Sequence, residues 1–218
     1  MSVLASSATL LGLSLAWWHP ASTPLPSRAD IWPIDRIAIG RWSPAADSTS
    51  TVLQDALIVA GPLLLLATSR GDMSRGLKLA LIEIEALIAS AAAVRFVKVA
   101  VYRPRPEVFL GITGGTSTRQ SFYSGHTTIA FTAVVATAYL YLETFPEDRA
   151  MRWAFVACGA VAAGVGVLRV VAGKHYPTDV LAGAAAGALI GWAVPALHRA
   201  RRMHLSVGPG GLALQGRF

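Results

Sequence analysis

The sequence predicts an all-α, polytopic membrane protein: a helical bundle with five to six transmembrane helices. Only 14% of its 218 residues are charged, against about 25% in ordinary soluble domains, whereas 54% are hydrophobic. The mean hydropathy is +0.52. This composition excludes a disordered chain, which needs low hydrophobicity and many charges. The single cysteine, Cys158, excludes a secreted domain held together by disulfides.

Apolar segments provide the predicted spans. Four of them approach or reach the roughly 20 apolar residues that a spanning helix needs. They are residues 77–101, 126–142, 153–168 and 180–197. A fifth segment, 56–68, is shorter and contains Pro62, but its neighbours favour a span. Residues 3–18 are apolar too, and they are either a signal peptide, although the basic residues of such a peptide are absent, or a first span.

We divide the chain into three parts. Residues 1–50 hold the signal peptide or first span, followed by an extramembrane loop rich in Pro, Ser and Asp. Residues 51–198 form one membrane domain, in which we find no tandem repeat. Residues 199–218 form a C-terminal tail that is first basic and then rich in glycine.

Glycines indicate how the last span packs. Gly183, Gly187 and Gly191 are spaced by four residues and therefore share one face of that helix. Small residues at this spacing let two membrane helices approach closely. The Ala- and Gly-rich span that contains Gly159 and Gly164 is a candidate partner.

The distribution of Arg and Lys indicates the orientation. If the last four spans alternate in direction, three basic regions fall on one side: the loop after residue 68, residues 143–152 and the tail after Leu197. The positive-inside rule assigns that side to the cytoplasm. The opposite, outer side holds several further cations in residues 103–123 and 170–179, and these need another explanation.

Three short polar segments, 98–106, 121–127 and 169–179, lie on this outer side, each at the end or start of a span. Lys98, Arg105 and Arg169 carry the ammonium and guanidinium groups that match phosphate oxygens. Ser124 and Gly125 precede an apolar helix, whose first backbone N–H groups and dipole favour an anion. The segments therefore predict a phosphate site.

Two histidines complete these segments. Asp179 follows His175 by four residues, and a carboxylate at one imidazole nitrogen leaves the other free as a base or nucleophile. His126 has no carboxylate close by in the sequence, which suits a protonated group that donates to a leaving oxygen. One histidine as nucleophile and one as acid, among several cations, describes phosphoryl transfer without a metal.

Simpler interpretations exist for single residues. A Lys or Arg near the end of a span usually anchors the helix at the interface, and this is the interpretation of Arg95, Arg103 and Lys174 taken one by one. A Ser-Gly-His sequence at a helix start is usually only a cap. Glu83 and Glu85 lie inside a span, where we expect a structural or interfacial role. The joint occurrence of the three segments favours the phosphate site.

Taken together, the segments resemble the signature of the type 2 phosphatidic acid phosphatase family, lipid phosphate phosphatases that are related to vanadium haloperoxidases. The family pattern reads Lys-x6-Arg-Pro, Pro-Ser-Gly-His and Ser-Arg-x5-His-x3-Asp. The matching residues here are Lys98, Arg105, Pro106, Ser124, Gly125, His126, Arg169, His175 and Asp179. The chain departs from the pattern at Tyr123, where proline is usual, and at Leu168, where serine is usual.

The resemblance implies a role for each matching residue. His175 would attack phosphorus and form a phosphohistidine, Asp179 would orient it, and His126 would protonate the leaving oxygen. Water would then release phosphate. The substrate phosphate would be bound by Lys98, Arg105, Ser124, Gly125 and Arg169.

The implied function is that of a membrane lipid-phosphate phosphatase without metal or cofactor. Its substrate would be polyprenyl pyrophosphate, phosphatidic acid or phosphatidylglycerol phosphate. The expected partners are this substrate and membrane lipids, with no nucleic acid, and a homo-oligomer is left open. We expect the bacterial inner membrane, with the site facing the periplasm or cell exterior. A headgroup phosphotransferase and a non-catalytic phospholipid-binding protein are the alternatives, and the number of spans disfavours a haloperoxidase.

Overall fold

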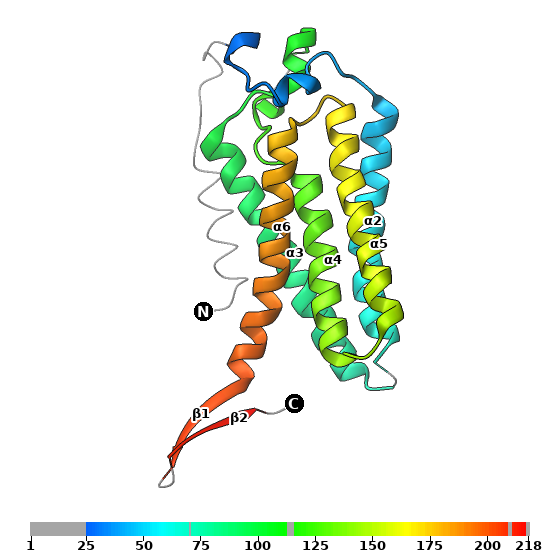
Figure 1. The fold of residues 1–218 in the computed structure, drawn as a ribbon, viewed down its shortest axis with the longest axis vertical. Helices are drawn as coiled ribbons and strands as arrows, with labels where there is room; N and C mark the ends of the chain where they lie inside the picture. Colours follow the sequence, from blue (N-terminus) through cyan, green and yellow to red (C-terminus); the bar gives the residue numbers. More distant parts are fainter. Residues whose placement is uncertain (1–24, 70, 113–115, 209–210, 217–218) are drawn as a thin grey trace.

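The computed structural model describes residues 25–69, 71–112, 116–208 and 211–216. Within these ranges, five long helices lie side by side in a bundle (Figure 1). They are α2 (Pro44–Ala67), α3 (Met73–Val101), α4 (Gly125–Thr144), α5 (Arg149–Val171) and α6 (Pro177–Arg202). The predicted all-α, polytopic class is confirmed. The predicted signal peptide or first span at residues 3–18 lies outside the described residues.

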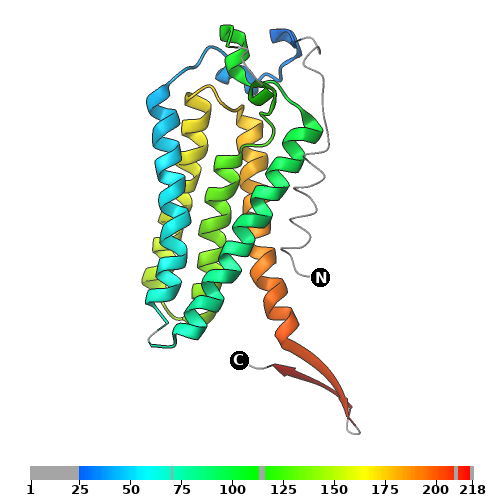
Figure 2. The same ribbon diagram turned by 180° about the vertical axis from the view of Figure 1, so that it is seen from behind.

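The loops that connect the helices lie at the two ends of the bundle. Two 3-10 turns precede α2, η1 (Arg28–Asp30) and η2 (Asp35–Ala38), and two more, η3 (Pro106–Leu110) and η4 (Thr116–Arg119), join α3 to α4. Figures 1 and 2 show these turns at one end of the bundle, with the α5–α6 connection. The α2–α3 and α4–α5 connections lie at the other end. The helices therefore alternate in direction, as the predicted orientation requires.

Two boundaries differ from the prediction: the start of α2, and the end of α6, which runs to Arg202 and not to residue 198. The extramembrane loop was expected to end at residue 50, but α2 begins at Pro44. The Ser43 hydroxyl accepts a hydrogen bond of 3.2 Å from the Ala46 N–H, and proline suits the first helical position, so these residues start the helix. Beyond α6, the tail forms an antiparallel hairpin of β1 (Met203–Gly208) and β2 (Gly211–Gly216), which lies outside the bundle (Figure 1).

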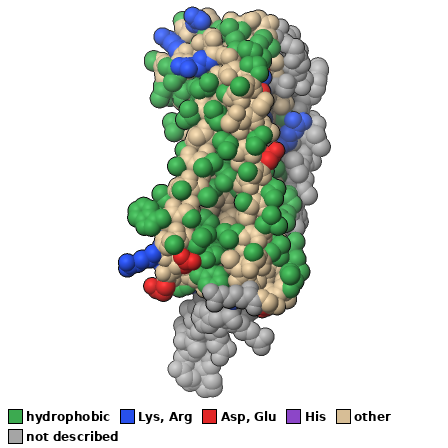
Figure 3. Space-filling view, turned by 90° about the vertical axis from the view of Figure 1, so that its right-hand side faces the viewer, with side chains coloured by type: hydrophobic (Ala, Val, Ile, Leu, Met, Phe, Trp, Pro, Cys, Tyr) green, Lys and Arg blue, Asp and Glu red, His purple; other side chains and the backbone are tan. Residues whose placement is uncertain are grey.

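Hydrophobic side chains cover the flanks of the bundle. Large apolar residues are more than half exposed on four of the helices, as in Val59, Leu81, Val156 and Leu189. On the face in Figure 3, most charged side chains lie toward the two ends, and between them hydrophobic side chains and uncharged surface prevail, apart from charged groups at the right edge. An apolar girdle of this kind is suited to lipid. The protein is thus an integral membrane protein.

Polar residues inside the bundle explain why the five helices differ in composition. Residues Pro44–Ala67, Arg149–Val171 and Pro177–Ala200 are long and apolar enough to cross a membrane. The other two helices, α3 and α4, carry buried polar side chains that face their neighbours. One example is the contact of 2.6 Å between the Ser90 and Thr132 hydroxyls. Polar groups that pair inside the bundle leave its lipid face apolar.

The two carboxylates of α3 also face other helices. Glu83 is fully buried, and its Oε1 lies 2.8 Å from Oγ1 of Thr137 on α4. A Cβ atom at Gly61 of α2 would lie 2.0 Å from the same oxygen, so only glycine leaves room for this carboxylate. Glu85 contacts Nε2 of His198 on α6 at 2.7 Å. These contacts support the predicted structural role.

The glycine face of α6 packs on α4. A Cβ atom at Gly187 would lie 2.2 Å from the Thr128 carbonyl oxygen, and one at Gly191 would lie 2.8 Å from that of Thr132. The candidate partner named from the sequence, the span with Gly159 and Gly164, is therefore wrong, since a Cβ atom at either glycine would meet nothing within 4 Å. The Thr132 hydroxyl, which reaches the Gly187 carbonyl at 3.1 Å, suits α4 as partner because it bonds across the close contact.

This packing predicts unequal effects for two identical substitutions. Gly187→Ala should lower the free energy of unfolding by about 1–3 kcal/mol, because the new methyl group meets backbone of α4. Gly159→Ala, the matched control, should be neutral or slightly stabilising because alanine favours the helix. Thermal unfolding of both variants in detergent measures the difference, and equal melting temperatures would contradict the packing.

Candidate active site

The three predicted polar segments meet at the end of the bundle where α3 ends and α4 and α6 begin. The Ser124 N–H donates to the Asp179 carbonyl at 3.0 Å, which joins the second segment to the third. Arg103, from the first segment, forms an ion pair with Asp179 of the third. All three segments thus contribute to one site.

The end of α3 places the first two cations. Lys98 lies in the last turn, and the backbone leaves the helix at Tyr102, which adopts a left-handed conformation with φ 50°. Arg105 is extended and lies between Pro104 and Pro106, with its N–H bonded to the Thr118 carbonyl at 2.7 Å. The two cations therefore do not share a helix face. Instead, the loop positions Arg105.

Ser124 occupies the position before the first turn of α4, but its side chain makes no capping bond. Its buried oxygen accepts a hydrogen bond of 2.9 Å from the Thr127 hydroxyl. The interpretation of this hydroxyl as a cap is therefore wrong, and its own proton is free to donate to another acceptor. Gly125 follows, and a Cβ atom there would lie 4.0 Å from Cε of Lys98. A phosphate at this helix start would meet Lys98 and the Ser124 hydroxyl together.

The loop between α5 and α6 places His175. Gly173 has φ +71°, and a Cβ atom there would lie 2.1 Å from the Arg41 carbonyl oxygen, so the turn requires glycine. His175 is 1% exposed, and its Nδ1 lies 3.7 Å from Oδ2 of Asp179. This distance is too long for a hydrogen bond but close enough for the carboxylate to orient the ring. The contact predicted between the two residues is therefore present.

Asp179 connects several elements. It is the third residue of α6, which begins at Pro177, and its Oδ2 accepts a hydrogen bond of 2.9 Å from the Tyr176 N–H. The same oxygen accepts a hydrogen bond of 2.5 Å from the Ser121 hydroxyl. The residue before the helix is Tyr176, and Asp179 satisfies its N–H from inside the first turn.

Arg103 and Lys174 do not serve as interface anchors, the interpretation considered from the sequence. Arg103 pairs with Asp179 and, at 2.7 Å, with Asp35 of η2. Lys174 pairs with Glu107 at 2.6 Å. Both side chains are directed into the polar end of the bundle, where carboxylates offset their charge.

Helix α2 supplies residues that the sequence pattern missed. Arg169 of α5 is 4% exposed and pairs with Asp47, and it donates to the Ser50 hydroxyl at 3.2 Å. The Thr51 hydroxyl lies 3.2 Å from Nε2 of His126. The three polar residues of α2 share one helical face, because Ser50 and Thr51 follow Asp47 by three and four residues. That spacing is the signal that could have placed them in the site.

Two arginines present unpaired donors. Nε of Arg105 and Nε of Arg169 are both buried and have no hydrogen-bond partner among the described residues. Buried N–H groups are nearly always paired, and guanidinium donors match oxyanions. Lys98 adds a third cation, since no carboxylate of the described residues lies within 4.0 Å of its ammonium group. The arrangement is suited to binding a phosphate group.

Residues 79–203 match the PAP2 superfamily. The chain belongs to this superfamily. Over 109 residues it is 37% identical to the lipid A 1-phosphatase of Rhizobium johnstonii, a match that covers 47% of this chain and 41% of that protein. Over 113 residues it is 36% identical to the lipid A 1-phosphatase of Rhizobium etli, covering 49% and 43%. The matched region thus spans less than half the length of these relatives.

The fold of this PAP2 chain has a counterpart among solved structures. The structure described as the first transmembrane PAP2 type phosphatidylglycerolphosphate phosphatase from Bacillus subtilis superposes with a TM-score of 0.59 at 21% identity. The superposition covers 91% of this chain and 96% of that one. Helix α2 and the turns before it lie outside the PAP2 match at residues 79–203.

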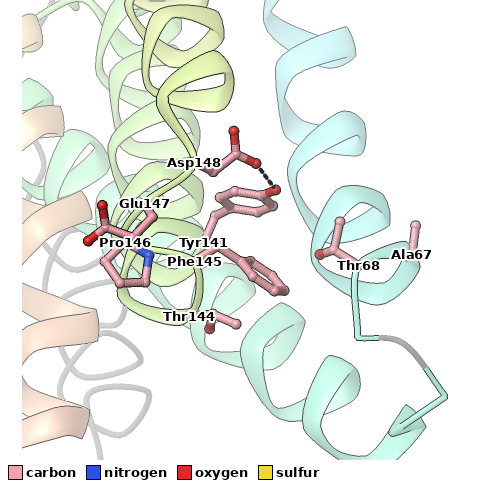
Figure 4. Close-up of a pocket in the computed structure, with 8 residues that line it drawn as sticks. All are labelled: Ala67, Thr68, Tyr141, Thr144, Phe145, Pro146, Glu147 and Asp148. Carbon is pink, nitrogen blue, oxygen red and sulfur yellow. Dashed lines mark hydrogen bonds between the residues drawn. The ribbon is translucent and has the colours of Figure 1, made fainter.

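A separate cleft lies at the opposite end of the bundle (Figure 4). Its volume is about 590 Å³, and it lies between the end of α2 and the turn from α4 to α5. Within it, the Tyr141 hydroxyl donates to Asp148 at 2.8 Å, and Asp148 accepts a bond of 3.0 Å from the Met151 N–H, which caps α5. These groups are engaged in the turn, and none belongs to the PAP2 signature. The PAP2 signature residues lie at the other end of the bundle.

Burial determines the protonation of His175. Removal from water, together with the charges of Lys98 and Arg105, lowers the pKa of His175 from 6.5 to about 3 and outweighs the opposite effect of Asp179. Because the pKa is lowered, the imidazole is neutral at every pH above that value. A neutral ring retains the lone pair that a nucleophile needs.

The lowered pKa predicts the titration of this residue. In ¹⁵N NMR of the protein in detergent, the imidazole of His175 should stay neutral from about pH 8 down to about pH 5, where an ordinary histidine has largely gained its proton. The spectrum of His175→Gln assigns the signal. A His175 signal that titrates with a midpoint near 6.5 would contradict the buried, neutral ring.

Proposed function

We propose that this protein is a membrane lipid-phosphate phosphatase that works through a phosphohistidine. The observation that carries the proposal is the buried imidazole of His175, which lies in one site with the unpaired Nε donors of Arg105 and Arg169. A neutral imidazole beside a carboxylate is a nucleophile, and the guanidinium donors supply the oxyanion partners. The family and the names of its relatives support the same reaction class.

The first chemical step forms a bond from His175 to phosphorus. Asp179 faces Nδ1, so Nε2 is the attacking nitrogen, and the bond from phosphorus to the lipid oxygen breaks. Protonated His126 gives its proton to that oxygen, which leaves as the lipid alcohol or lipid phosphate. Negative charge grows on the phosphoryl oxygens during the step. Lys98, Arg105 and Arg169 would stabilise it.

The second step releases phosphate. His126, now neutral, takes a proton from water as the water oxygen attacks the phosphohistidine. The bond from phosphorus to nitrogen breaks, and inorganic phosphate leaves while His175 recovers its lone pair. Thr51 would hold the His126 ring through its contact with Nε2. The site is thereby returned to its starting state without a metal. Among the described residues, no group of three or more His, Cys, Asp or Glu is placed to hold one.

The position of the site suggests the substrate and the membrane side. The catalytic residues lie at one end of an apolar bundle, so a lipid could keep its chains in the bilayer while its phosphate enters the site. The basic residues at the other end, Arg75 and Arg199 among them, favour the cytoplasm for that end. We therefore place the active site on the periplasmic or exterior side. Lipid A and phosphatidylglycerol phosphate, which the names of its relatives contain, join polyprenyl pyrophosphate as candidate substrates.

The nucleophile is tested by comparing two histidines. Purified protein in detergent, given a panel of these lipid phosphates, should release inorganic phosphate from at least one. His175→Ala should lower kcat by about a thousandfold or more, because no other group forms the covalent intermediate. The matched control is His198→Ala, which removes a histidine that pairs with Glu85 at the other end and should leave the rate intact. Full activity in His175→Ala would contradict the mechanism.

Metal independence gives a second test. Phosphate release by the wild-type protein should persist after dialysis against a chelator, because the arginines and lysine supply the positive charge. Vanadate, which adopts the five-coordinate geometry of the transition state, should inhibit. Loss of activity on chelation, with recovery on adding a divalent metal, would contradict this prediction.

A further inference from the structure

Asp35 and Arg103 form a buried ion pair beside the PAP2 signature residues without belonging to that signature. Asp35 lies in η2, well before the PAP2 match, and is 1% exposed. Arg103 lies in the loop after α3. Their closest atoms, Oδ2 of Asp35 and Nη2 of Arg103, are 2.7 Å apart. A charged pair excluded from water is costly unless other bonds complete it, so its remaining partners indicate its role.

The partners of Asp35 lie at the start of α6. Its Oδ1 accepts a hydrogen bond of 3.0 Å from the Thr178 N–H, and its Oδ2 accepts one of 2.7 Å from the Thr178 hydroxyl. The carboxylate thus satisfies one of the free N–H groups of the first turn and places negative charge at the positive end of the helix dipole. Asp35 therefore fixes the turn from which Asp179 projects.

The partners of Arg103 fix Asp179 itself. Nη1 of Arg103 donates to Oδ1 of Asp179 and, at 2.9 Å, to the Thr178 hydroxyl. The guanidinium carbon lies 4.1 Å from the centre of the Tyr176 ring, a cation–π contact. Both terminal nitrogens are thus occupied by protein acceptors. Arg103 therefore differs from Arg105 and Arg169, whose buried Nε atoms are unpaired among the described residues.

These contacts determine which oxygen of Asp179 faces the nucleophile. Oδ1 is held by Arg103, so Oδ2 is the oxygen that lies 3.7 Å from Nδ1 of His175. We propose that Asp35 and Arg103 are positioning residues that orient Asp179 and, through it, His175 for attack on phosphorus. This inference rests on the proposed phosphatase function. Neither residue would touch the substrate.

Two substitutions test the positioning role. Asp35→Asn preserves the shape of the side chain but removes its charge, and Arg103→Lys preserves the charge but removes the fork that joins the two carboxylates. Each should lower kcat by about ten- to a hundredfold while KM stays within about twofold, because binding groups are untouched. The double variant should be little worse than either single one, since the two residues act as a unit. Folding of each variant is measured by thermal unfolding in detergent.

The matched control is Arg36→Lys. Arg36 follows Asp35 directly, but its guanidinium donates to the carbonyl oxygens of Ile31 and Ala29 and to no catalytic residue. The kcat of Arg36→Lys should equal that of the wild type. If Asp35→Asn fails to fold, Thr178→Val provides the test instead, because it removes one contact of Asp35 and one of Arg103 and leaves both charges. It should lower kcat several-fold at unchanged KM.

The outcomes separate the two proposals. If the wild-type protein is active and the Asp35 and Arg103 variants have the same kcat as the wild type, only the positioning role is overturned. A raised KM at unchanged kcat in Arg103→Lys would also overturn it, because Arg103 would then bind the phosphate directly. A wild-type protein that releases phosphate from no lipid phosphate would overturn the proposed function, and the positioning role with it.

Discussion

The rest of the site depends on the hydrogen bonds and the ion pair that the carboxylate of Asp179 forms. It is fully buried, and a buried charge is tolerated only when neighbouring groups pair with it. Ser121, Tyr176 and Arg103 each donate to it, and they come from the loop before α4, the start of α6 and the loop after α3. Satisfying one carboxylate thus draws together the connections between helices. The ring of His175, whose Nδ1 faces this carboxylate, is positioned as a consequence.

The other charges at this end of the bundle must be paired as well. Lys98, Arg103, Arg105 and Arg169 would repel one another if nothing offset them. Carboxylates outside the family signature reduce this repulsion: Asp35 at Arg103, Asp47 at Arg169 and Glu107 at Lys174 and Arg105. The side chain of Asp47 is 37% exposed, so it holds Arg169 from the solvent side. An incoming phosphate would compete with it for a guanidinium that is already oriented.

The sequence predicted the parts of this structure that leave a local pattern. Apolar length located the helices, and the spacing of four residues between His175 and Asp179 predicted the contact that the structure shows between their side chains. The position of α2 in the site was not predicted, because Asp47 and Thr51 are separated from their partners by more than seventy residues. Asp35 lies in a loop without periodicity, and a single aspartate there resembles any solvent-exposed one.

The partner of the glycine face was missed for a related reason. Three glycines on one face indicate close packing but do not identify the other helix, because small residues are common on several spans. The structure selects α4, where Thr128 and Thr132 present backbone to the glycines. Residue spacing therefore predicted the existence of the interface, and only the three-dimensional arrangement supplied its partner.

The glycine face of α6 also contacts the candidate active site. A Cβ atom at Gly183 would lie 2.7 Å from the Ser124 carbonyl oxygen, so this glycine packs against the residue that precedes α4. The close approach brings the Asp179 carbonyl within 3.0 Å of the Ser124 N–H. A larger residue at position 183 would separate the start of α4, with Ser124 and His126, from the start of α6, with Asp179. Close packing of α6 on α4 therefore holds the start of α4 and the start of α6 together, and with them the signature residues that these two helices carry.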